Sequence, residues 1–152
     1  MHDYRRILAL VDFSETGTAV ARRALNLARL GQCELAFLHL IAPDPSLDGG
    51  YPPPSRSEYR QGFEQAGLRR LAFLAANLDA GEAHLLARYG QPGEAFADGI
   101  AEWRPDLVVA GDNRGYLGGR HDLLTLGRSG GENGVKRFLS QFMAPLRLSG
   151  GV

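Results

Sequence analysis

The sequence lacks the features that mark secreted, membrane-spanning and disulfide-bonded proteins. It contains a single cysteine, Cys33, so no disulfide can form within the chain. No stretch approaches the roughly 20 apolar residues that are needed to cross a bilayer. The first apolar run is too short and too poorly framed for a secretory signal. We therefore expect a cytoplasmic protein that has no membrane partner.

The sequence also has no excess of charge of either sign. Lysine plus arginine and aspartate plus glutamate both number 17. This balance gives the chain no general electrostatic reason to bind DNA or RNA, so we predict no nucleic-acid partner. The 152 residues, of which 44% are hydrophobic, suit one domain with a sizeable core. We therefore expect residues 1–152 to form a single domain.

Several motifs of catalytic and nucleotide-binding sites are absent as well. There is no G-x-x-x-x-G-K-[ST] loop, no G-x-G-x-x-G after the first apolar run and no G-x-S-x-G elbow. The four histidines have no spacing that would build a metal site on one element, and His39 is interpreted as packed and hydrogen-bonded. No general base has a clear partner. We therefore predict no catalytic residue, no metal ligand and at most weak nucleotide hydrolysis.

What the sequence does contain is a series of short apolar runs. Residues 7–11, 35–41 and 107–110 are almost continuously apolar, as strands covered on both faces are. Residues 84–89 alternate in polarity and form a weaker fourth candidate, nearer an edge of the sheet. These runs predict at least four strands.

Helical patterns separate the apolar runs. Helical periodicity covers 16–30, 59–78, 91–103 and, less clearly, 135–142. We expect Ser14 to cap the first helix, Gly31 to end it in the left-handed conformation and Pro105 to end the third. Alternating strands and helices predict an α/β, Rossmann-like fold with a mostly parallel sheet and helices on both faces.

A Pro/Gly-rich segment at about 42–57 interrupts this rhythm. It contains five prolines and two glycines, which predicts a loop rather than a helix or strand. The loop follows the second strand, where ligand or partner surfaces often lie. A mobile linker is an equally acceptable interpretation.

Parallel sheets bind ligands beyond the carboxyl ends of their strands, where the strand order switches. This rule indicates Asp12, Leu40 and the segment that begins at Gly111. The carboxylate of Asp12 suits a ligand amine or hydroxyl. It equally suits the cap of the first helix, and position alone does not decide between the two.

Two glycine clusters follow the apolar run at 107–110. The first contains Gly111, Asn113 and Gly115, and the second contains Gly127, Ser129 and Gly130. Glycines let backbone amides approach phosphate oxygens, and Arg114 between the clusters can add a charge-assisted hydrogen bond. The alternative interpretation is a flexible surface loop.

Several segments together resemble the universal stress protein family. Residues 7–15 are similar to the family's first strand and its Asp, and 24–28 to its first helix. Residues 35–40 resemble a strand that ends in a His-Val pair, 89–94 the Gly-x-Pro entry to the third helix, and 105–111 the fourth strand. The resemblance therefore rests on five motifs in the family's order.

The resemblance implies a five-stranded sheet of the adenine nucleotide alpha hydrolase-like type, an adenine-nucleotide pocket in a stress-response or regulatory module, and a homodimer. The ligand implied is ATP or another adenine nucleotide, with or without Mg²⁺. Asp12 would then contact the adenine or ribose, and Leu10, Val11 and Leu40 would lie around the base. The glycine clusters would hold the phosphates through Gly111, Asn113, Gly115, Gly127, Ser129 and Gly130.

The glycine spacing departs from the ATP-binding branch of the family, which carries Gly-x2-Gly-x9-Gly-Ser/Thr after the fourth strand. From Gly111, the next glycine comes one residue late. We prefer this reading, which leaves residues 146–148 for the fifth strand. A second reading takes 122–126 as the strand before the glycines. The irregular spacing keeps open a non-ATP-binding, dimerising interaction protein of the same fold.

Overall fold

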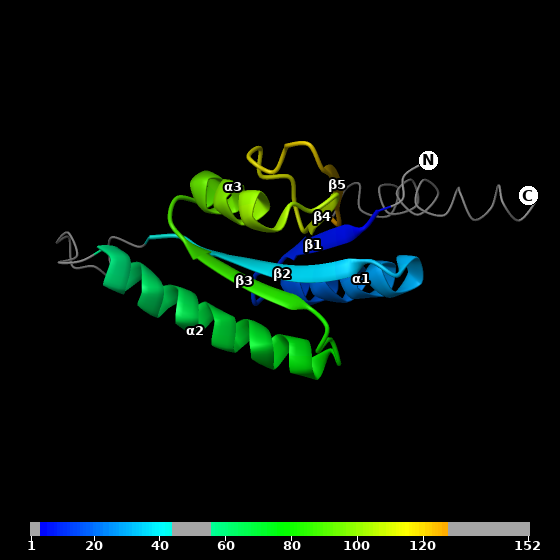
Figure 1. Cartoon of the computed structure of the whole chain (residues 1–152), viewed down its shortest axis with the longest axis horizontal. Helices are drawn as coiled ribbons and strands as arrows, with labels where there is room; N and C mark the ends of the chain where they lie inside the picture. The colour runs from blue at the N-terminus through cyan, green and yellow to red at the C-terminus, as the bar shows by residue number, and fades with distance from the viewer. Residues whose placement is uncertain (1–3, 44–55, 128–152) are drawn as a thin grey trace, which may run out of the picture.

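The computed structural model describes residues 4–43 and 56–127 (Figure 1). In chain order the elements alternate between strand and helix until two strands follow one another at the end. They are β1 (Arg6–Leu10), α1 (Glu15–Gly31), β2 (Glu34–Ile41), α2 (Arg56–Asn77), β3 (His84–Tyr89), α3 (Pro92–Trp103), β4 (Leu107–Ala110) and β5 (Asp122–Thr125).

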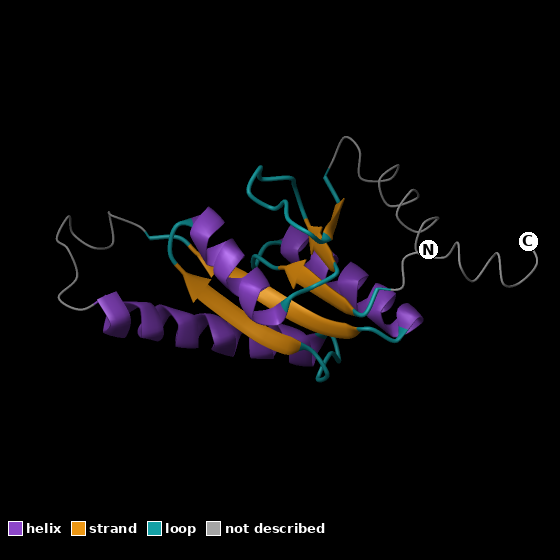
Figure 2. Cartoon of the chain, turned by 45° about the horizontal axis from the view of Figure 1, so that its top comes forward, coloured by secondary structure: helices purple, strands orange, loops and turns teal. Residues whose placement is uncertain are grey.

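The five strands form one parallel sheet in the order β3-β2-β1-β4-β5. Helices α1 and α2 cover one face and α3 covers the other (Figures 1 and 2). This confirms the predicted α/β, Rossmann-like sheet with helices on both faces. Among the described helices, none is both long and apolar enough to cross a bilayer.

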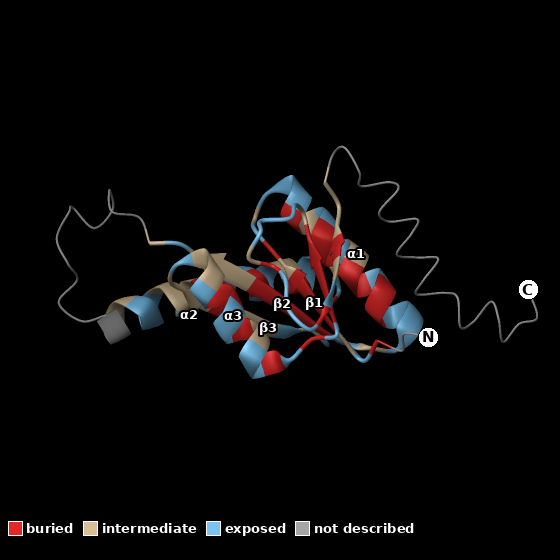
Figure 3. Ribbon diagram, turned by 90° about the horizontal axis from the view of Figure 1, so that it is seen from above, coloured by how far each residue is buried: buried red, intermediate tan, exposed pale blue. Residues whose placement is uncertain are grey.

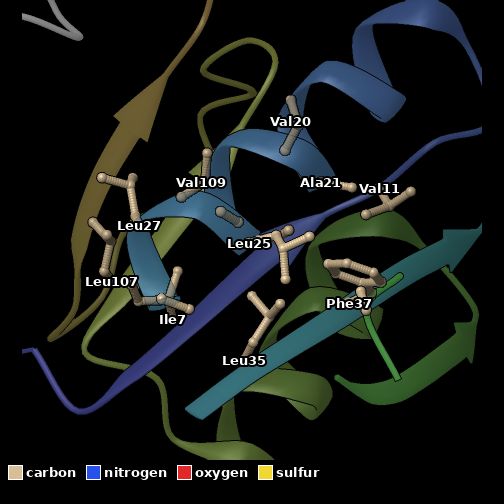
Figure 4. Close-up of a cluster of buried hydrophobic side chains, with 14 of the residues drawn as sticks. Ile7, Val11, Val20, Ala21, Leu25, Leu27, Leu35, Phe37, Leu107 and Val109 are labelled. Atoms are coloured by element: carbon tan, nitrogen blue, oxygen red, sulfur yellow. The ribbon is translucent and has the colours of Figure 1, made fainter. Parts of the chain in front are cut away.

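The core explains why the strand sequences are almost continuously apolar. Successive strand residues point to opposite faces, and here both faces are covered. On β1, Ile7 packs toward α1 and Leu8 toward α3, and both are fully buried. Phe37 of β2 joins Ile7 and Leu25 on the α1 side, where Figure 4 shows the side chains together. The buried residues accordingly concentrate in the central strands (Figure 3).

The ends of α1 follow simple capping chemistry, with one correction. Ser14 is the N-cap, as predicted, and its hydroxyl accepts a hydrogen bond from the Gly17 amide at 3.2 Å. The left-handed residue is Gln32, with φ of 55°, whereas Gly31 lies within the helix. The helix runs one residue farther than predicted because the amides of Gln32 and Cys33 still bond to carbonyls of its last turn.

The last strand differs from the preferred prediction. The position beside β4 is taken by Asp122–Thr125, which pairs with Leu107–Ala110 in parallel register. The prediction that 146–148 supplies the fifth strand is therefore wrong for this sheet. The apolar content of 146–148 suggested a strand, but Leu124 of β5 packs into the core on the α1 side. The strand that the second reading places at 122–126 is therefore confirmed. Residues 146–148, the predicted helix at 135–142 and most of the loop at 42–57 lie outside the described residues.

Candidate ligand site at the strand ends

A pocket of about 380 Å³ lies at the carboxyl ends of β1, β2 and β4. It occupies the switch point of the sheet, because the chain leaves β1 toward β2 on one side and β4 pairs with β1 on the other. Five residues predicted from sequence line it: Leu10, Val11, Asp12, Leu40 and Gly111. The topology therefore brings together segments that lie some hundred residues apart in the chain.

Asp12 lies where β1 ends, and its carboxylate is held in place by the next turn. Its Oδ1 accepts a hydrogen bond from the Ser14 amide at 3.1 Å and another from the Ser14 hydroxyl. Ser14, not Asp12, is the cap of α1. Of the two interpretations left open by position, the helix cap is therefore excluded for Asp12, whose role is to orient the capping residue and to line the pocket.

The pKa of the Asp12 carboxyl lies below its ordinary value. The hydrogen bond from the Ser14 hydroxyl is the main cause of its lowered pKa, and partial burial opposes it. The Ser14 amide and the positive charge of Arg114 lower the pKa further. The pocket thus presents the carboxylates of Asp12 and Asp112, with the Arg114 guanidinium as a positive charge on its lining.

Two glycines allow the end of β1, the start of α1 and the end of β4 to meet closely. A Cβ at Gly17 would lie 1.8 Å from the Asp12 carbonyl oxygen, a distance that no side chain can occupy. A Cβ at Gly111 would lie 2.9 Å from Cγ2 of Thr16. The first turn of α1 is therefore packed directly onto the floor of the pocket.

His39 also lines the pocket, and its tautomer follows from its partner. Its Nδ1 lies 2.8 Å from the Val11 carbonyl oxygen, which can only accept, so Nδ1 carries the hydrogen. Burial lowers the pKa of His39 more than the Val11 hydrogen bond raises it. Nε2 of the neutral ring is then a hydrogen-bond acceptor. The prediction of a packed, hydrogen-bonded His39 is confirmed, but its place in the pocket was not foreseen.

The loop after β4 brings Asp112, Arg114 and Tyr116 to the pocket. Asn113 and Gly115 do not line it. The side-chain oxygen of Asn113 accepts from the Gly115 amide at 3.0 Å, and Gly115 has a φ of 79°. These two residues therefore shape the turn that carries Arg114.

The second glycine cluster is described only at its first member. A Cβ at Gly127 would lie 3.1 Å from Asp112 Oδ1 and 3.6 Å from the Gly111 carbonyl oxygen, so Gly127 sits beside the loop without lining the pocket. Ser129 and Gly130 lie outside the described residues.

Several residues that line the pocket were not predicted to do so from the sequence: Ser14, Thr16, His39, Pro92, Asp112 and Tyr116. Ser14 and Thr16 directly follow Asp12, and Pro92 follows the predicted third strand, so the strand-end rule extends to them. Tyr116 gave no signal, because it reaches the pocket only through the path of the loop. In residues 4–43 and 56–127, no three His, Cys, Asp or Glu side chains converge as a metal site would require.

Comparison with known proteins gives consistent matches. A model of the universal stress protein family matches residues 3–141. The universal stress protein A homolog of Haemophilus influenzae is 24% identical over 113 residues, which cover 74% of this chain and 80% of the relative.

Solved structures agree in fold. A universal stress protein family member from Burkholderia pseudomallei superposes with a TM-score of 0.57 at 20% identity, over 82% of this chain and 97% of its own. A universal stress protein in complex with cAMP superposes with a TM-score of 0.54 at 17% identity, over 80% and 95% of the two chains.

Proposed function

Since the chain belongs to the universal stress protein family, we propose that it is a stress-response or regulatory binding module whose strand-end pocket takes an adenine nucleotide. The observation that carries the proposal is the composition of this pocket. Apolar side chains of Leu10, Leu40 and Pro92 and the ionised Asp12 share one cavity with Arg114. This combination suits a flat apolar base, a hydroxylated sugar and an anionic phosphate.

The volume and the donor set fit such a ligand. Ligand pockets usually have volumes of about 300–1,000 Å³, and this one has about 380 Å³. The Asp12 carboxylate only accepts hydrogen bonds, so it suits the ribose hydroxyls or the adenine amine. The guanidinium of Arg114 suits a phosphate.

The cAMP complex of a structurally similar protein supports an adenine nucleotide as the ligand class. We extend the proposal to ATP, with Mg²⁺ carried on the phosphates when it is present. Asn113 and Gly115 would act by shaping the phosphate loop, and Gly127, Ser129 and Gly130 by closing it. A cytoplasmic homodimer of single-domain chains completes the proposal, and sedimentation velocity tests the dimer.

Thermal unfolding in the presence of ligands tests the nucleotide site. Any adenine compound present at 100 times its dissociation constant should stabilise the protein by about 2.7 kcal/mol. ATP, AMP, cAMP and adenosine are compared, each with and without Mg²⁺. Failure of all of them at millimolar concentration contradicts the proposal and favours the non-ATP-binding, dimerising interaction protein.

A variant of Arg114 tests whether this residue binds the phosphate of the nucleotide rather than its base. Arg114→Ala should weaken AMP and ATP by roughly ten- to a hundredfold, the value of a lost charge-assisted hydrogen bond. Adenosine binding should be unchanged. Arg120→Ala is the matched control, because Arg120 is exposed in the same loop and does not line the pocket. Equal losses for adenosine and AMP would show that Arg114 acts on the fold rather than on the phosphate.

A further inference from the structure

A second hollow, of about 560 Å³, lies between α1 and α2 on the face of the sheet opposite to α3. We call it the α1–α2 groove. Its lining includes Phe13 and Thr18 at the start of α1 and Arg69, Arg70, Phe73 and Asn77 along α2. It shares no lining residue with the strand-end pocket.

The groove carries an exposed aromatic side chain. Phe73 is 71% exposed, and among the described residues only Phe73 and Leu30 are large hydrophobic side chains left open to water. Phe73 lies on α2 one turn from Arg69 and Arg70 and one turn from Asn77. Burying such a side chain against a partner is favourable, so Phe73 supplies an anchor point.

The groove also carries positive charge that no acidic side chain of the groove neutralises. Arg69 and Arg70 are exposed, no Asp or Glu lines the groove, and neither arginine forms an ion pair with any described residue. By contrast, Arg29, Arg60 and Arg88 are each paired with carboxylates. The guanidinium of Arg70 lies 3.9 Å from the centre of the Phe13 ring, which holds it at the wall of the groove.

We propose that the α1–α2 groove docks an acidic segment of a partner protein, with an apolar side chain of that segment packed on Phe73 and its carboxylates paired with Arg69 and Arg70. The lining stretch of α2 from Ala66 to Asn77 is about 16 Å long at 1.5 Å per residue, which suits about three turns of a peptide helix. Two arginines on a chain with no net charge favour an acidic peptide over a nucleic acid, which needs a broader basic surface.

This surface is separate from the proposed nucleotide site and does not depend on it. The probe is a fluorescein-labelled synthetic peptide with glutamates around a Leu-Phe pair, and its anisotropy is followed with the full chain. Two comparison peptides replace the glutamates by lysines or the Leu-Phe pair by serines. Only the first peptide should bind, and its affinity should fall with added salt.

Variants of the groove locate the site. Phe73→Ser and Arg69→Glu should each weaken the acidic peptide by about tenfold or more. Arg120→Glu changes charge by the same amount on the exposed loop outside the groove and should leave the affinity unchanged. Both groove side chains are exposed, so the variants should melt at the parent temperature.

Four results would overturn the proposal. They are no binding of the acidic peptide at millimolar concentration, binding that Phe73→Ser leaves intact, tighter binding of a single-stranded oligonucleotide than of the peptide, and self-association of the protein that Phe73→Ser abolishes. The last would assign the groove to a second copy of this chain.

Discussion

Gly17 is the residue whose missing side chain matters most to the site. The place of a Cβ is taken by the backbone of Asp12, whose carbonyl oxygen lies 1.8 Å away from it. Gly17→Ala must therefore move either β1 or α1. Although alanine is the better helix former by about 1 kcal/mol, we expect this variant to lose about 1–3 kcal/mol in urea unfolding, because overpacking outweighs propensity.

A second glycine provides the control for this substitution. Gly62 lies in α2, where an added Cβ meets nothing within 4 Å. Gly62→Ala should therefore stabilise the protein by up to about 1 kcal/mol. A Gly17→Ala variant that is as stable as the parent would show that the start of α1 can move to accommodate the methyl group.

The ionisation of Asp12 makes the protein sensitive to acid. The folded pKa of Asp12 lies below its ordinary value, so its charged form stabilises the fold above the unfolded pKa, which is about 3.9. This stabilisation is lost as the pH falls through the folded pKa. Asp12→Asn should therefore flatten the pH dependence of the free energy of unfolding below about pH 4. If the free energy of unfolding depends on pH in the same way in parent and variant, Asp12 does not cause the acid sensitivity.

At the scale of residues, the sequence predicts what lies next to a strand end. Asp12, Leu40 and Gly111 follow from the switch-point rule, whereas the family resemblance implied Leu10 and Val11, and all five line the pocket. Tyr116 reaches the pocket through a loop whose path depends on tertiary packing, so no local pattern indicates it.

At the scale of elements, the cap of α1 connects helix stability to the pocket. Ser14 accepts from the Gly17 amide and donates its hydroxyl hydrogen to Asp12. Ser14→Ala should lower the free energy of unfolding by about 1 kcal/mol and should also raise the pKa of Asp12 toward its ordinary value. NMR titration of the Asp12 carboxyl measures the change in its pKa. Ser14→Asn keeps a capping oxygen but has no hydroxyl, so it should keep most of the stability that the cap provides.

His121 holds the loop between β4 and β5 in place through its contacts with Leu117 and Phe96. Its ring is buried, Nε2 lies 2.6 Å from the Leu117 carbonyl oxygen, and Phe96 of α3 packs against it at 5.8 Å between ring centres. His121→Ala should loosen the loop that carries Arg114 and Tyr116. We expect faster amide exchange over residues 112–121 and weaker AMP binding, whereas exchange in α2 should be unchanged. Protection that stays at the parent level would show that the loop is held elsewhere.

Elements differ in how far the sequence determines them. Helices α1 and α3 were predicted to within about one residue because their caps and Pro105 leave local signals. Strand β5 is four residues long and only Leu124 of it is fully covered. The second reading of the sequence offered 122–126 as a strand, but the choice between it and 146–148 depends on pairing with β4, which local patterns do not report.

At the scale of the whole molecule, Phe37 tests whether the described elements unfold together. Its side chain is fully buried in the core cluster on the α1 side of the sheet. Phe37→Ala should lower stability by about 3–5 kcal/mol. Circular dichroism and tryptophan fluorescence of Trp103, on the opposite face, should report the same midpoint if residues 1–152 are one cooperative domain.

The central position of β1 has a consequence for synthesis of the protein in the cell. One edge of β1 pairs with β2, which follows shortly, but the other edge pairs with β4, which begins only at Leu107. Ribosomes add about 5–20 residues per second, so the second partner of β1 emerges roughly 5–20 s later. During that interval the nascent chain has an apolar strand with an unpaired edge, so we expect chaperones that recognise such segments to bind it before translation ends.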